Sequence, residues 1–119
     1  MKFIINVSSG LGFVLIAAMA VYCATKAGTH LFTVSLRHQL KDSLIKVFEI
    51  IPPAMDSDLG KGATGDSEEY RGIPPSEVAA AVLKGLKKNE YEIAIGEAKG
   101  LVEASKKDFV MAFQKLNNW

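Results

Sequence analysis

Short apolar runs alternate along this chain with stretches in which apolar residues recur at helical spacing. The runs are rich in β-branched and aromatic residues and end at serine, glycine or proline, as buried strands do. They lie at residues 3–7, 45–51 and 91–95. Apolar side chains every three or four residues predict helices at 21–41, 74–88 and 97–119. Strands that alternate with helices indicate an α/β fold, with parallel strands covered by helices.

Each predicted helix has apolar residues at helical spacing. The first carries Ala24, Ala27, Leu31, Val34 and Leu36. The second carries Val78, Val82, Leu83 and Leu86. The third carries Leu101, Phe109, Phe113 and Leu116. We expect the second stripe to be buried, and the small residues of the first helix to allow close packing against the sheet or another helix.

Proline and glycine mark the connections. Pro52 and Pro53 end the second strand, because neither can donate a ladder hydrogen bond. Glycine and small residues at 10–20 predict a loop that packs closely, and residues 56–72 predict a polar surface loop.

Composition narrows the possible functions. The chain has 119 residues, enough for one modest domain that spans residues 1–119. Its net charge of +1 favours neither nucleic acid nor an anionic membrane as a partner. One cysteine, Cys23, allows no intrachain disulfide and no zinc cluster. The isolated His30 and His38 lack the spacing of metal ligands, so we expect no metal site. A cytoplasmic protein is the default expectation.

The N-terminus permits a different interpretation. Ala18, Met19 and Ala20 fit the small-x-small pattern before a signal cleavage site, and residues 12–23 carry no charge. That uncharged stretch is shorter than the roughly 20 residues of a transmembrane helix. A small secreted protein with residues 1–20 as its signal is therefore an alternative.

Three polar residues near the start form a candidate catalytic group. Ser9 follows the first strand, and Tyr22 and Lys26 are four residues apart, which places both on one face of the first helix. An ammonium beside a phenol favours the phenolate, and a serine hydroxyl can donate to a substrate oxygen without carrying charge. Together such groups can move a proton to or from an alcohol or carbonyl oxygen.

The serine followed by Tyr-x-x-x-Lys resembles the short-chain dehydrogenase/reductase family. The whole chain is similar to the catalytic, C-terminal half of that family, the later part of a Rossmann-like doubly wound parallel sheet. The resemblance implies that Ser9 and Tyr22 are catalytic, with Ser8 as the fallback for Ser9. It implies that Lys26 also holds the nicotinamide ribose. The activity implied is NAD- or NADP-dependent redox chemistry on a small alcohol or carbonyl substrate.

The segment after the second strand resembles the family's Pro-Gly segment. The resemblance implies cofactor contacts at Pro52, Met55 and Ser57, besides those of Tyr22 and Lys26. Pro53 replaces the glycine here. The loop at 58–72 corresponds to the family's variable substrate lid and indicates no particular substrate.

The family's phosphate-binding turn has no counterpart in this sequence, since no G-x-x-x-G-x-G follows a strand. We therefore expect the chain to be inactive by itself. The strand at 3–7 would be an exposed sheet edge, so a homo-oligomer is expected, formed through that edge or through the Tyr22–Lys26 helix. The alternative function is a non-catalytic dimerising or interaction protein that keeps the scaffold.

Overall fold

Residues 2–53 and 73–118 are described by the structure, a computed structural model. The strands are β1 (Lys2–Val7), β2 (Ile45–Ile51) and β3 (Glu92–Ala94). The helices are α1 (Ala20–Gln39), α3 (Pro75–Lys87) and α4 (Glu97–Asn117), with short 3₁₀ turns η1 (Gly10–Gly12) and η2 (Ala17–Met19). The predicted loop at 56–72, with Met55 and Ser57, lies outside the described residues.

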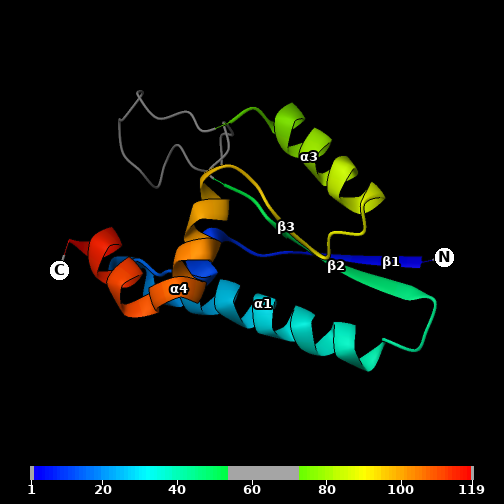
Figure 1. Cartoon of the computed structure of the whole chain (residues 1–119). Helices are drawn as coiled ribbons and strands as arrows, with labels where there is room; N and C mark the ends of the chain where they lie inside the picture. Colours follow the sequence, from blue (N-terminus) through cyan, green and yellow to red (C-terminus); the bar gives the residue numbers. More distant parts are fainter. Residues whose placement is uncertain (1, 54–72, 119) are drawn as a thin grey trace.

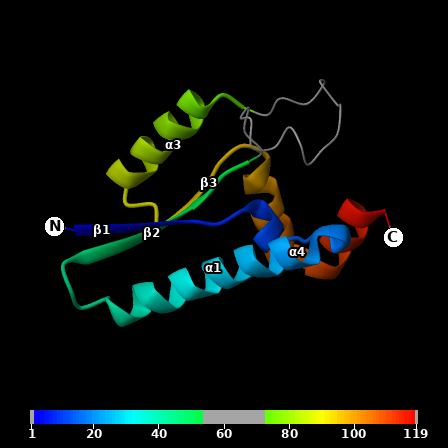
Figure 2. The same ribbon diagram turned by 180° about the vertical axis from the view of Figure 1, so that it is seen from behind.

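The three strands form one parallel sheet in the order β1-β2-β3. Helix α1 runs along one face and α3 covers the other, while α4 stands at the carboxyl end of the strands (Figure 1). The view from behind shows the same layers (Figure 2). The predicted α/β architecture with three parallel strands is confirmed, and β1 is an edge of this sheet.

The core between the sheet and α3 is apolar. Phe48, Ile93 and Ile95 are buried there, and half-buried residues of α3 pack against them. These are Val78, Ala81, Val82 and Leu86. Leu83, which we placed in the buried stripe, is 59% exposed. The prediction was wrong at this position because the face that packs on the sheet follows residues 78, 81–82 and 85–86, and Leu83 lies outside that spacing.

The face of α1 that meets the sheet is mostly polar. Thr33 is buried and accepts a hydrogen bond from Asn6 Nδ2 of β1, at 3.0 Å. Arg37 Nε donates to Val47 O of β2, at 3.0 Å. Leu31 and Val34, which lie at helical spacing in the sequence, are exposed. The apolar stripe of α1 therefore turns away from the sheet, because polar residues of β1 and β2 require polar partners on the inner side of the helix.

Helix α4 is interrupted at Asp108, whose backbone is extended (φ −160°, ψ 93°). Asp108 Oδ1 accepts from Met111 N at 3.0 Å, so its side chain caps the second helical piece. Ala98 and Val102 of the first piece pack on Ile51. The sequence predicted one amphipathic helix from 97 to 119, and the cap at Asp108 explains why it divides.

The first 20 residues, the candidate signal, contribute β1, η1 and η2, and every residue of β1 pairs in register with β2. Across residues 2–53 and 73–118, none of the helices combines the length and the hydropathy that crossing a membrane requires.

Replacing Gly85 with alanine should destabilise the fold, because an added Cβ would lie 2.7 Å from Ile93 Cδ1 in the buried core. We expect Gly85→Ala to cost about 1–3 kcal/mol of unfolding free energy, measured by urea denaturation. The matched control is Gly100→Ala in α4, where nothing lies within 4 Å, which should raise stability by about 0.5–1 kcal/mol. Equal effects of the two substitutions would contradict this packing.

Candidate active site

The candidate site lies at the carboxyl end of the sheet, where open α/β folds bind their ligands. There β1 leads through Ser8 and Ser9 into η1, and β3 leads through Gly96 into α4. The amino-terminal turn of α1 follows η2. The chain therefore brings the end of β1 and the start of α1 together at the carboxyl end of the strands.

Ser9 begins the turn η1. Its backbone is extended (φ −159°, ψ 151°), and its Oγ accepts a hydrogen bond from Leu11 N at 3.1 Å. This bond caps the turn and fixes the direction of the hydroxyl oxygen. Because a hydroxyl that accepts can still donate its own hydrogen, Ser9 can donate to a substrate oxygen.

Tyr22 and Lys26 lie one turn apart at the start of α1. Lys26 Nζ stands 5.7 Å from the centroid of the Tyr22 ring, within the range of a cation–π contact. Tyr22 is 44% exposed. An exposed phenol beside an ammonium is accessible to a small substrate, so the predicted pairing of these two side chains matches the geometry.

The serine turn rests directly on the backbone of α1. A Cβ at Gly12 would lie 2.8 Å from Lys26 C and 2.8 Å from Ala27 N. A Cβ at Gly10 would lie 2.9 Å from Leu101 Cδ1 of α4. Glycine at both positions lets η1 fit between the two helices, and this contact fixes the turn that carries Ser9 against the helix segment that carries Lys26.

Ser8, the fallback for the catalytic serine, has a different environment. It is 1% exposed, and its Oγ donates to Glu49 Oε2 at 2.6 Å. Its backbone N donates to Ile50 O at 2.9 Å, which continues the pairing of β1 with β2. Since its hydroxyl is buried and bonded to a carboxylate, Ser8 is the poorer candidate, and the geometry favours Ser9.

Sequence reasoning missed Glu49 and treated His30 as isolated. His30 Nδ1 lies 2.7 Å from Glu49 Oε1, and ligand atoms of His30, Glu49 and Glu92 all lie within 4.8 Å of one another. Lys106 Nζ is 3.3 Å from Glu92 Oε2, and Ser8 donates to Glu49. These contacts supply the carboxylates with donors and positive charge.

The two prolines after β2 differ in their surroundings. Pro52 is half-buried, and Pro53 is buried against Gly96, where an added Cβ would lie 3.2 Å from Pro53 Cγ. Gly96 has φ +61°, a conformation that favours glycine. Pro53 therefore packs against the start of α4. The cofactor contacts predicted for Pro52, Met55 and Ser57 stay predictions, the last two outside the described residues.

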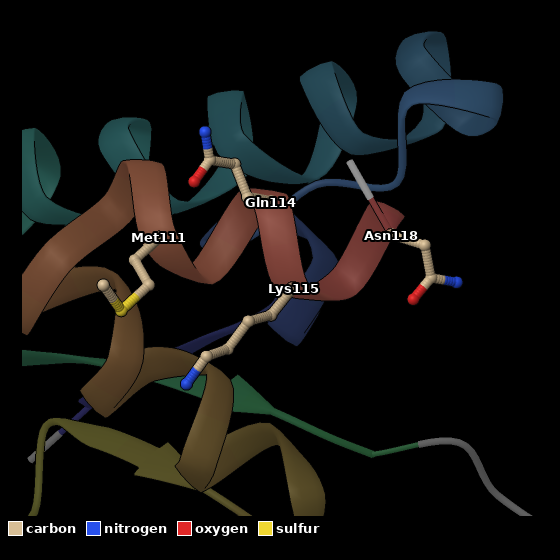
Figure 3. Close-up of a pocket in the computed structure, with 4 residues that line it drawn as sticks. All are labelled: Met111, Gln114, Lys115 and Asn118. Atoms are coloured by element: carbon tan, nitrogen blue, oxygen red, sulfur yellow. The ribbon is translucent and has the colours of Figure 1, made fainter.

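A hollow of about 430 Å³ lies at the other end of α4. Met111, Gln114, Lys115 and Asn118 line it, all from the last turns of this helix and its cap (Figure 3). None of the candidate catalytic residues lines it. The hollow therefore does not extend the site at the carboxyl end of the strands.

Comparison with known proteins settles the family. A sequence model described as short chain dehydrogenase matches residues 3–68, more than half of the chain. The chain belongs to the short-chain dehydrogenase family. A relative, the uncharacterized oxidoreductase DltE of Bacillus subtilis, is 40% identical over 115 residues, which are 96% of this chain and 46% of the relative. The probable oxidoreductase EphD of Mycobacterium tuberculosis is 28% identical over 105 residues, covering 73% of this chain and 18% of EphD.

Solved structures show the same fold. A short chain dehydrogenase from Burkholderia cenocepacia, in complex with NADP, superposes with a TM-score of 0.80 at 25% identity, over 96% of this chain and 46% of that one. A short-chain dehydrogenase from Streptomyces avermitilis gives 0.73 at 24% identity, over 96% of this chain and 49% of that one. The chain thus spans about half the length of DltE and of these two dehydrogenases.

Replacing Gly12 with alanine should separate the serine turn from α1, because the added Cβ would meet backbone atoms that have no room to move aside. We expect a loss of about 1–3 kcal/mol in unfolding free energy and a changed amide chemical shift at Ala27. Urea denaturation and ¹⁵N-resolved NMR measure the two effects. An unchanged Ala27 amide would show that the turn does not rest on the helix.

Proposed function

We propose that this chain carries the catalytic residues of an NAD(P)-dependent oxidoreductase that interconverts a small carbonyl compound and its alcohol. The observation that supports this most is the placement of Ser9 on a turn packed, through Gly12, against the backbone at Lys26. That packing joins the serine to the helix segment that presents Tyr22. Membership in the short-chain dehydrogenase family supports the same reaction class.

Each of the three side chains has a distinct proposed role. Tyr22 transfers a proton between its phenol oxygen and the substrate oxygen, acting as the general acid in reduction. Lys26 places positive charge beside the Tyr22 ring, which stabilises the phenolate left after that transfer. Ser9 donates a hydrogen bond to the same substrate oxygen and so holds the carbonyl in place.

The hydrogen-bond donors of Tyr22 and Lys26, at the carboxyl end of the strands, fit the nicotinamide end of a dinucleotide. The ammonium of Lys26 and the phenol of Tyr22 can bind the hydroxyls of the adjoining ribose, and Pro52, Met55 and Ser57 are the further proposed contacts. A bound NADH or NADPH supplies the hydride that these side chains lack. The Burkholderia relative was solved with NADP, which makes NADPH the first cofactor to test. The single cysteine supports a cytoplasmic site for this reaction.

Because we expect the chain to be inactive by itself, turnover is measured with a dinucleotide-binding half supplied as a second polypeptide. There, replacing Tyr22 with phenylalanine should reduce carbonyl reduction about 10²–10⁴-fold, because the ring remains and the proton donor is lost. NADPH-dependent reduction of a panel of small ketones measures turnover. Fluorescence titration measures NADPH binding, which should weaken far less than turnover falls, because Lys26 still binds the ribose.

The matched control is Tyr91→Phe just before β3, where the ring stacks on Phe48, and this change should leave turnover unchanged. Absence of NADPH binding by the parent chain up to millimolar concentration would mean either that function requires a dinucleotide-binding half or that the chain is not an enzyme, as in the dimerising alternative.

We further propose that the chain forms a homo-oligomer through the outer face of α1. Val21, Leu31 and Phe32 on this face are 82%, 66% and 62% exposed, although all three are large and apolar. Exposed apolar side chains that gather on one helix face indicate an interaction surface. The edge strand β1, where Phe3 and Val7 are about half exposed, offers a second such surface.

A negative charge introduced in place of Phe32 should therefore prevent copies of the chain from associating. We expect Phe32→Glu to shift the chain toward monomer at concentrations where the parent associates, because an unpaired carboxylate would be buried in the interface. Sedimentation velocity over a concentration series measures this. The control is Leu83→Glu on α3, 59% exposed in the parent, which should leave association unchanged. Association that survives Phe32→Glu would point to the β1 edge instead.

A further inference from the structure

We propose that Glu49 is a positioning residue, which sets where Ser9 stands relative to Tyr22 and Lys26. The inference rests on the roles proposed above for those three residues. Glu49 lies in β2, the central strand, and is fully buried. Its backbone is paired on both sides, since Asn6 of β1 and Glu92 of β3 are its register partners.

Both oxygens of the buried carboxylate are bonded. Oε2 accepts from Ser8 Oγ at 2.6 Å, and Oε1 lies 2.7 Å from His30 Nδ1. Which atom donates in the pair with His30 depends on the imidazole tautomer. Both distances are short for hydrogen bonds, so each contact closely limits how far the bonded groups can move apart. A buried carboxylate must keep such partners, so these two bonds fix the positions of Ser8 and His30.

The two bonded residues each adjoin a part of the proposed active site. Ser8 immediately precedes Ser9, so the bond to Glu49 holds the strand end from which the serine turn starts. His30 follows Lys26 by one helical turn, and Tyr22, Lys26 and His30 share one face of α1. The Phe13 ring, just after η1, packs against the His30 ring with centroids 4.3 Å apart. Glu49 thus joins the serine turn to the helix face that carries the tyrosine and the lysine.

A neighbouring contact offers a control within the same two elements. Asn6 Nδ2 donates to Thr33 Oγ1 at 3.0 Å, which also connects β1 with α1. This bond involves neither the serine turn nor His30. If the Glu49 bonds only added stability, disrupting the Asn6–Thr33 bond would have the same consequences at the active site as disrupting the Glu49 bonds.

The test compares Ser8→Ala and Glu49→Gln with Thr33→Val, at temperatures that give equal fractions folded. The reporter is the Leu11 amide, which donates to Ser9 Oγ. In Ser8→Ala and Glu49→Gln we expect its hydrogen-exchange protection to fall roughly tenfold or more and its chemical shift to move. The His30 ring ¹⁵N signals should move in Glu49→Gln. Thr33→Val should leave the Leu11 amide as in the parent.

Turnover gives a second, separate measurement. With a dinucleotide-binding half supplied as a second polypeptide, NADPH, and a ketone that the parent then reduces, Ser8→Ala should lower kcat about tenfold or more while KM changes little, because the serine turn is displaced but present. Glu49→Gln keeps the side-chain volume and serves in place of Ser8→Ala if that variant does not fold. An unmoved Leu11 amide in both variants, or an equal change in Thr33→Val, would overturn the inference. Turnover with the dinucleotide-binding half supplied tests the proposed function, whereas the Leu11 amide decides separately whether Glu49 positions the turn.

Discussion

A carboxylate buried in the middle of the sheet constrains much of the surrounding structure. Glu49 has no contact with solvent, so the neighbouring elements must provide hydrogen-bond donors. They do so through Ser8 at the end of β1 and His30 on α1. The inner face of α1 is consequently mostly polar, and the large apolar residues Val21, Leu31 and Phe32 are left exposed on its outer face. The buried carboxyl group of Glu49 thus favours the observed orientation of the helix, which exposes the surface that we propose as the oligomer interface.

The order and approximate bounds of the strands and helices could be predicted from the sequence because they depend on local properties, although the division of α4 at Asp108 was missed. The run Ile45–Ile51 is a strand over the residues that its apolar, β-branched composition indicated, with prolines at its end. The orientation of α1 could not be predicted in this way. Thr33 and His30 become inward residues only through Asn6 and Glu49, which lie 27 and 19 residues away. Periodicity identified the apolar stripe of α1, but the stripe does not face the sheet.

In the candidate site, too, local features could be predicted from the sequence and long-range contacts could not. Ser9, Tyr22 and Lys26 could be singled out because the spacing of the last two is local and their chemistry is specific. Glu49 could not, since a single glutamate in an apolar strand is equally typical of a solvent-facing position. The signal that could have found it is the length of the apolar run: with apolar residues on both sides of it, a strand buried on both faces leaves no exposed position for the glutamate.

The inner face of α1 combines the structural and the catalytic side chains in one stripe. Tyr22, Lys26, His30, Thr33 and Arg37 follow one another at intervals of four, four, three and four residues, so all lie on the same side of the helix. The last three bond to groups in or beside the strands, whereas Tyr22 and Lys26 lie in the first two turns of α1 and contact each other. A rotation of α1 that broke the bonds to the sheet would turn the tyrosine and the lysine by the same angle. The polar core therefore restricts the orientation of the two side chains on which the proposed proton transfer depends.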